Sequence, residues 1–331
     1  MKKIIGVLFI GFLLNACDDG DLNIETLDFE SSTTYSCNAS NPGFFIYKFK
    51  NNETLILQLD EVNFINEITP VGSPRTIYIN ATNKVIYRLY NGALSQTTIC
   101  NSITPANPIV TNEWNATSGI IEIITTANRT TNETLNSSVV TGYTHSIKLK
   151  NINFLKSSGT NQLFSELSFG NYITPAIQPV DFTPFTLKNC GNYNLLFKVS
   201  GKQSLTFNLD SNLYINVITP VGTPRIGLLN SQDNVKFKIY NANINDAFVC
   251  ADPTPSLPIL EQVWTSENGV QNVSGIIEIT TTIEHEIPTD NQSPIIGYRH
   301  KTILKKVTLT RNNVSFKLGD IYILGEFVRP L

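Results

Sequence analysis

The stretch Ile68-Thr69-Pro70-Val71-Gly72-Ser73-Pro74-Arg75 occurs twice in this chain. Its second copy, Ile218-Thr219-Pro220-Val221-Gly222-Thr223-Pro224-Arg225, lies 150 residues later (225 − 75 = 150). The copies differ only where Thr223 replaces Ser73, and both residues are small and carry a hydroxyl. A second match of this length so far along the chain indicates a tandem duplication.

The duplication extends on both sides of this stretch. Cys100 and Trp114 recur as Cys250 and Trp264 at the same offset of 150 residues (250 − 100 and 264 − 114). Farther along, residues 118–123 match residues 274–279 at an offset of 156 (274 − 118 = 156). Because surface loops absorb insertions at little cost, we expect the two copies to share one fold.

The composition sets broad limits on function. The 331-residue chain has a formal net charge of −3, and only 15% of its residues are charged. Without residues 1–16, which include Lys2 and Lys3, the charge is −5 (−3 − 2 = −5). No cluster of lysine and arginine is present, so no nucleic-acid partner is expected. The length is typical of about two domains, each long enough to bury its own core.

Strand signals run through both copies. Short stretches rich in β-branched and aromatic residues are separated by turn residues, and no sustained helical period occurs after residue 16. Within residues 139–155, Ile147, Leu149 and Ile152 indicate one buried face that is broken by a bulge. The sequence therefore predicts an all-β protein with two tandem, homologous β-sandwich domains of the immunoglobulin-like kind.

The expected domain limits follow from the repeat. We expect about seven to eight strands in each sandwich. The first domain is expected over residues 35–178 and the second over residues 179–331, with a proline-containing linker at residues 175–184.

The first 16 residues have the pattern of a signal peptide. Lys2 and Lys3 precede an apolar run at residues 4–14, which at 11 residues (14 − 4 + 1 = 11) is too short to span a membrane. The run ends in Leu14-Asn15-Ala16-Cys17, which resembles the lipobox of bacterial lipoprotein precursors. This resemblance implies cleavage before Cys17 and acylation of that cysteine by two or three chains, enough for a stable membrane anchor. An ordinary secretory signal with a coincidental cysteine is the alternative.

Acidic residues follow the lipidation site directly, at Asp18, Asp19 and Asp21. This run resembles the surface-export signal of lipoproteins from Bacteroidota, and it implies an outer-membrane protein that faces the cell surface. In other bacteria an aspartate after the cysteine retains the lipoprotein at the inner membrane, and a solvated spacer is a third interpretation. Residues 17–34 have the composition of a flexible tether.

The four remaining cysteines fall two in each copy. Three pairings are open to four cysteines, but only Cys37–Cys100 with Cys190–Cys250 gives both copies the same internal structure. An exported protein reaches a compartment where disulfides persist. In the chain-entropy picture, each bond would stabilise its domain by roughly 4 kcal/mol.

Two repeated residue types are candidates for binding. The prolines and glycines of the repeated stretch explain a rigid turn, but they do not explain Arg75 and Arg225. Each arginine either pairs within its own domain, with Asp60 or Asp210 as a candidate partner, or offers an exposed guanidinium to a carboxylate or glycan. Trp114 and Trp264 either form a surface on which a sugar stacks or plug the core against the disulfide.

No arrangement of residues predicts catalysis. Glu122 and Glu278 lie mid-strand, and nothing pairs them as the carboxylates of a glycosidase are paired. His145 and His300 follow Gly-Tyr in both copies and have the pattern of strand-face histidines. The run 284–286, Glu-His-Glu, is a poor ligand set for a metal because its carboxylates alternate faces. We therefore expect no cofactor, no metal and no enzyme activity.

Three classes of function remain, in order of preference. The first is a membrane-anchored binding or scaffold module that takes a glycan or protein ligand, with two copies that raise avidity. The second is a subunit of a cell-surface assembly, either pilus-like or accessory to an uptake complex. The third is a hydrolase.

Overall fold

A computed structural model of the chain describes residues 26–38, 43–101, 105–191 and 195–331. The expected signal peptide, Cys17 and the acidic run lie outside these residues. The described chain is all β apart from short helical turns, as the sequence predicts. None of the described helices is long and apolar enough to cross a membrane.

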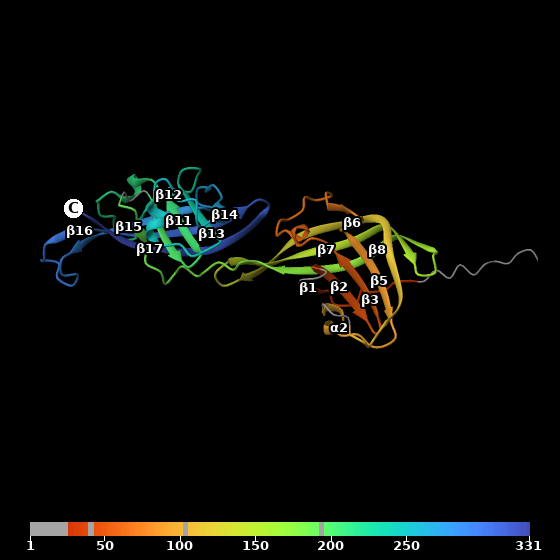
Figure 1. The fold of residues 1–331 in the computed structure, drawn as a ribbon. Coiled ribbons are helices and arrows are strands. Elements are labelled where there is room, and N and C mark those ends of the chain that lie inside the picture. The colour runs from red at the N-terminus through yellow and green to blue at the C-terminus, as the bar shows by residue number, and fades with distance from the viewer. Residues whose placement is uncertain (1–25, 39–42, 102–104, 192–194) are drawn as a thin grey trace, which may run out of the picture. The chain divides into compact units, whose positions relative to one another are not determined.

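The first repeat forms an eight-stranded sheet (Figure 1). Its strands are β1 (Tyr35–Asn38), β2 (Phe44–Lys50), β3 (Glu53–Gln58), β4 (Arg75–Tyr78), β5 (Lys84–Tyr90), β6 (Val110–Asn132), β7 (Ser137–Lys156) and β8 (Asn161–Pro175). They are ordered β1-β2-β3-β5-β6-β7-β8, and β4 pairs with β6. The helical turns η2 (Glu61–Phe64) and α2 (Gln96–Cys100) follow β3 and β5.

The second repeat forms a nine-stranded sheet with a corresponding plan. Its strands are β9 (Lys188–Asn189), β10 (Leu195–Ser200), β11 (Gln203–Asn208), β12 (Arg225–Leu228), β13 (Asn234–Tyr240), β14 (Leu260–Ser266), β15 (Ile276–His285), β16 (Ile295–Arg311) and β17 (Val314–Pro330). Its helical turns are η3 (Ser211–Tyr214) and α3 (Asp246–Cys250). Strands β14 and β15 together correspond to β6, because the insertion between the two repeats separates them.

The bulge predicted within residues 139–155 is present, and the second repeat has a counterpart. In β7 the buried residues Ile147, Leu149 and Ile152 share a face only because Asn151 takes a positive φ of 52° and shifts the alternation by one residue. Lys306 takes a φ of 51° at the corresponding point of β16 (306 − 151 = 155). The bulge therefore belongs to the duplicated fold.

The chain divides into two compact units that do not follow the repeat boundary. Unit 1 consists of residues 1–60, 77–121 and 148–170. Unit 2 consists of residues 61–76, 122–147 and 171–331. Unit 2 therefore contains the whole second repeat and also the distal ends of β6 and β7, which the expected limits assign to the first domain.

The core of unit 2 explains this division. Val140 and Tyr143 of β7 are buried in one hydrophobic cluster with Phe237, Trp264 and Phe316 of the second repeat. Burying these side chains removes apolar surface from water, at about 25 cal/mol for each Å². The apolar end of the first-repeat hairpin is thus part of the second core.

Part of the expected tether is packed rather than free. Phe29 is buried and meets the ring of Tyr87 edge-on, with centroids 6.4 Å apart. Its carbonyl accepts a bond from Lys48, and Lys198 donates to Phe182 in the same way. The folded repeat therefore starts at the pair Asp28-Phe29, which recurs as Asp181-Phe182.

Both expected disulfides are present. Cys37 bonds to Cys100 with a Cα–Cα distance of 5.5 Å, and Cys190 bonds to Cys250 with a distance of 5.3 Å. Each joins the start of its repeat to a short helix, α2 or α3. The bonds lie within the repeats, which confirms the predicted pairing.

Candidate functional site

The repeated stretch forms a tight turn in both copies. The amide of Ser73 donates to the carbonyl of Pro70 at 3.0 Å, and that of Thr223 donates to Pro220 at 3.0 Å. Gly72 has a φ of +75° at the third position of the turn. This geometry is that of a type II turn, which needs a residue that tolerates positive φ at that place. The glycine is therefore explained by the backbone.

An arginine holds the base of each turn. Arg75 donates from its guanidinium to the carbonyls of Asn63, Ile65 and Glu67, with distances of 3.2, 3.2 and 2.6 Å. These carbonyls belong to η2 and the loop after it, so one planar side chain fixes the loop at three points.

Arg225 does the same in the second copy. It donates to the carbonyls of Leu213, Ile215 and Val217 at 2.9, 3.0 and 2.9 Å, and also to the hydroxyl of Thr281. Asp210 caps η3 by accepting from the amide of Asn212 at 2.9 Å. Both guanidinium groups thus bind main-chain oxygens, and this arrangement favours the intradomain role of the arginines over display to a ligand.

A buried threonine–histidine pair lies beneath each turn. Thr69 and Thr125 exchange bonds, with Thr69 N to Thr125 O at 3.2 Å and Thr125 N to Thr69 Oγ1 at 3.1 Å. The hydroxyl of Thr125 lies 2.9 Å from Nδ1 of His145, whose Nε2 lies 3.0 Å from the hydroxyl of Thr174. Rings of Phe64 and His145 meet edge-on with centroids 5.6 Å apart.

The second copy repeats this arrangement with Thr219, Thr281 and His300. Burial lowers the pKa of His145 and of His300 to about 4, and the nearby arginines act in the same direction. Both imidazoles are therefore neutral at pH 7. They serve as hydrogen-bonded core residues beneath the turn.

The outer end of each turn has a different character. Val71 and Val221 occupy the second position of the turn and are fully exposed. A type II turn sets no requirement for valine there, and burial does not explain an apolar side chain in water. Each repeat thus displays the same apolar tip on a base fixed by arginine, threonine and histidine.

The two tryptophans are buried. Trp114 meets Tyr87 at a centroid distance of 4.7 Å, and Trp264 meets Phe316 at 5.1 Å. This placement favours packing over a sugar-stacking surface, and the ring contacts of both tryptophans are with aromatic side chains. Nε1 of Trp264 donates to Oε1 of Gln262 at 3.3 Å, whereas Nε1 of Trp114 has no hydrogen-bond partner within the described chain.

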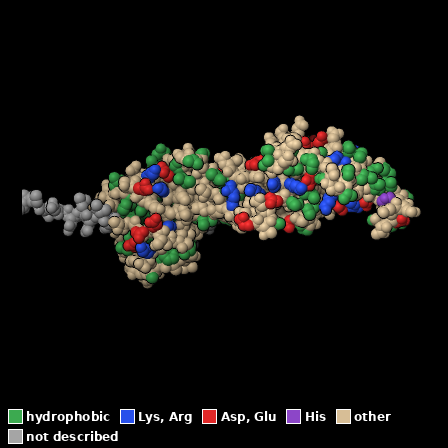
Figure 2. Space-filling model, turned by 180° about the vertical axis from the view of Figure 1, so that it is seen from behind, with side chains coloured by type: hydrophobic (Ala, Val, Ile, Leu, Met, Phe, Trp, Pro, Cys, Tyr) green, Lys and Arg blue, Asp and Glu red, His purple; other side chains and the backbone are tan. Residues whose placement is uncertain are grey.

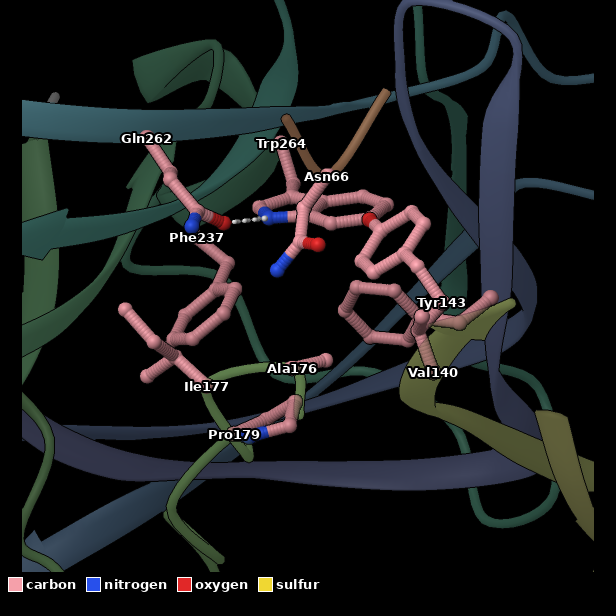
Figure 3. A pocket seen from close by; sticks show the side chains of 10 residues that line it. Asn66, Val140, Tyr143, Ala176, Ile177, Pro179, Phe237, Gln262 and Trp264 are labelled. Atoms are coloured by element: carbon pink, nitrogen blue, oxygen red, sulfur yellow. Dashed lines mark hydrogen bonds between the residues drawn. The ribbon is translucent and has the colours of Figure 1, made fainter. Parts of the chain in front are cut away.

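Figure 3 shows a small cavity beside Trp264. Tyr143 and Val140 face Phe237 and Trp264 across it, and the amide of Asn66 points into it (Figure 3). The cavity measures about 10 Å³. That is room for roughly one water, so it is a packing defect and not a ligand site.

A wider depression covers β12 and β15 and measures about 690 Å³. The carboxylates that line it already have partners, since Asp233 accepts from Asn230 at 2.8 Å and Glu278 accepts from Lys305 at 2.6 Å. Figure 2 shows that Lys and Arg alternate with Asp and Glu on the face in view. Each carboxylate that lines the depression therefore already has a hydrogen-bond partner.

Two of the remaining charged candidates are also engaged. Glu284 forms an ion pair with Arg299, and Nδ1 of His285 lies 2.8 Å from the carbonyl of Ser293. Among the described residues, no group of three or more His, Cys, Asp or Glu side chains could hold a metal ion.

Comparison with known proteins adds no relative: no protein-family model, no curated protein and no solved structure matches the chain.

Sequence reasoning missed two repeated features. The first is the exposed valine, whose signal was its identity in both copies at a position that the turn does not constrain. The second is the buried lysine, Lys48 or Lys198, whose signal was a cation amid apolar strand residues on an inward position. Both features became visible only when burial was known.

Proposed function

We propose that the protein is a lipid-anchored, surface-exposed binding module without catalytic activity. Its anchor is Cys17, its export signal is Asp18, Asp19 and Asp21, and its ligand is a glycan or a protein. The proposal of a binding role rests on one observation: Val71 and Val221 are identical, apolar and fully exposed on two rigid turns.

The rigid base supports this role. Binding of a ligand to a preformed turn costs little conformational entropy. The loop is already fixed, because each arginine donates hydrogen bonds to three main-chain carbonyls. A small apolar tip flanked by proline suits contact with the apolar face of a sugar ring or with a shallow pocket on a protein. Two equal tips on one chain would also raise avidity.

The test compares binding of the purified mature protein with that of the double variant Val71→Asp/Val221→Asp. Labelled protein is applied to an array of polysaccharides and, in parallel, to intact cells of the producing bacterium. We expect the double variant to lose at least about tenfold in retention and each single variant to lose less, because avidity needs both tips.

A matched control is Val62→Asp, since Val62 is an exposed valine that lies off the turn. Equal retention of the native protein and the double variant would contradict the role of the turns. Absence of retention on every surface would contradict the binding function itself.

A further inference from the structure

The apolar ends of the two long hairpins are in unequal surroundings. In unit 2, the end of the β6–β7 hairpin packs into the core of the second repeat, where Val140 is only 3% exposed. Its counterpart in the β15–β16 hairpin is Ile295 (295 − 140 = 155), which is 41% exposed. The same surface that is buried in the first hairpin is open in the second.

Neighbouring positions show the same difference. Ile68 packs against the core of unit 2, whereas its counterpart Ile218 is 52% exposed (218 − 68 = 150). Ile296 and Ile287 add two further exposed apolar side chains at this end. We call Ile218, Ile287, Ile295 and Ile296 the terminal apolar patch.

The contact inside unit 2 also shows what the first hairpin end binds. Main-chain groups of β17 meet the hairpin: the amide of Lys317 donates to Oγ of Ser138 at 3.0 Å, and that of Asp320 donates to the carbonyl of Leu135 at 2.9 Å. Beside them, Val140 and Tyr143 lie opposite Trp264 (Figure 3). The receiving surface thus consists of a tryptophan and an edge strand.

The first repeat has a corresponding surface made from β8 and the side chains that cover Trp114, which is itself only 1% exposed. Leu163 on β8 is 64% exposed. Nζ of Lys156 lies over the Trp114 ring, 4.4 Å from the centroid. The counterpart of Lys156 is Arg311 (311 − 156 = 155), which in unit 2 turns toward Glu67 of the bound end, at 3.9 Å. A hairpin end that bound beside Trp114 would therefore displace Lys156.

The two indole groups differ in their hydrogen bonds. Nε1 of Trp114 is buried and has no hydrogen-bond partner in the part of the chain that is described. A buried donor without an acceptor costs about 1–3 kcal/mol. In unit 2 the acceptor for Nε1 of Trp264 is Oε1 of Gln262, which belongs to the same repeat, whereas the amide of Asn66 donates to the carbonyl of Pro175 at 3.0 Å.

We propose that the terminal apolar patch of one chain binds the Trp114–β8 surface of a second copy, as the first hairpin end binds the second repeat within unit 2. The two surfaces differ, so the contact is head-to-tail. Such a contact does not close on itself and would extend into linear assemblies. The proposal is independent of the turn tips, because it needs no ligand.

Pro288 and Pro294 limit the strength of this contact. They end the strand pairing of the β15–β16 hairpin, and proline donates no main-chain bond. The second hairpin therefore lacks the extension that lets Leu135 and Ser138 bond to β17. We expect weak association that becomes significant when anchored chains are crowded on a membrane.

The experiment uses the chain from residue 18 onward, which retains every described residue. Its mass is measured by light scattering and analytical ultracentrifugation from about 1 µM to 1 mM. We expect a series of oligomers that grows with concentration. Ile295→Glu should remove the series by blocking the patch, and Leu163→Glu should remove it by blocking the receiving surface.

The decisive measurement mixes the two variants. Each retains one intact surface, so a head-to-tail contact predicts a heterodimer that stops at two chains. Ile259→Glu, at an exposed isoleucine outside the patch, is the matched control and should assemble as the native chain does. Circular dichroism and disulfide mapping establish folding, and Ile218→Glu replaces any patch variant that fails to fold.

A native chain that remains monomeric at 1 mM would overturn the proposal. So would an Ile295→Glu chain that still assembles, since the contact would then lie elsewhere. Folded single variants that are monomeric but form no heterodimer on mixing would also overturn it, because that result indicates a symmetric contact.

Discussion

Nζ of Lys48 donates to the carbonyl of Phe29 at 2.9 Å in a buried site and to the carbonyl of Glu30 at 3.4 Å. Burial lowers the pKa of Lys48, while Glu30 and Asp28 oppose this effect from a distance. Lys198 and Phe182 repeat the relationship at 2.9 Å. The lysine ties the first residues of each repeat to the sheet.

Replacing this lysine should destabilise the first repeat. Lys48→Ala removes buried methylene groups and leaves the Phe29 carbonyl without its donor, for an expected loss of about 2–4 kcal/mol. Lys50→Ala is the control, because Lys50 is exposed and its bond to Asp28 is a surface ion pair. Urea denaturation followed by circular dichroism measures both. If Lys48→Ala and Lys50→Ala lower the free energy of unfolding by equal amounts, the buried hydrogen bond between Lys48 and Phe29 has no energetic role.

Acid should destabilise the protein through His145 and His300. Their folded pKa of about 4 lies below the unfolded value of 6.5, so between these values the unfolded chain binds more protons. The contribution of the two neutral histidines to the free energy of unfolding is therefore fully present above pH 6.5. It falls as the pH drops toward 4, by at most about 3 kcal/mol for each histidine. The measurement is the free energy of unfolding against pH. Replacing both histidines with glutamine should flatten the curve in this window, and an unchanged slope would contradict the assignment.

The hydrogen bonds that fix the base of the turn should require arginine and not merely a positive charge. Arg75→Lys keeps the charge but cannot reach the carbonyls of Asn63, Ile65 and Glu67 together. We expect a loss of about 1–3 kcal/mol and faster hydrogen exchange at the Ser73 amide, which closes the turn. Lys84→Arg, at an exposed position, serves as control. An unchanged rate of hydrogen exchange at the Ser73 amide would show that the turn is rigid without the hydrogen bonds of Arg75.

Cys17→Ala should release the protein from membranes. The apolar run that ends in Leu14-Asn15-Ala16-Cys17 is the basis for this prediction, and the acyl chains on the cysteine supply the membrane affinity. Detergent phase partitioning of the native and variant proteins measures the effect. A variant that still enters the detergent phase would rule out a lipid anchor at this cysteine.

Replacing Asp18, Asp19 and Asp21 with alanine should leave anchoring intact and remove surface exposure. Acylation depends on Cys17 and the residues before it, whereas the acidic run belongs to the mature chain, where a sorting system could read it. Protease treatment of intact cells at equal membrane abundance separates the two steps. Equal cleavage of both proteins would reduce the run to a spacer, and protection of both would place the protein on the periplasmic side.

The duplicated all-β architecture could be predicted from the amino-acid sequence alone. The repeated stretch established the duplication, and the duplication made one disulfide pairing consistent with two equal domains. Period-two patterns then predicted the strands, and the broken alternation in residues 139–155 predicted the bulge at Asn151. These properties are local or follow from comparing the chain with itself.

Which side chains are buried and which are exposed became known only from the three-dimensional fold. Arg75 and Trp114 have the same sequence signal whether they face a ligand or the core, and their partners are main-chain carbonyls and rings that lie apart in the sequence. Val140 and Ile295 occupy equivalent positions, yet one is buried and the other exposed. Burial depends on which other element packs against a side chain. The alternating pattern of a strand shows which residues share a face, but it does not show which element covers that face.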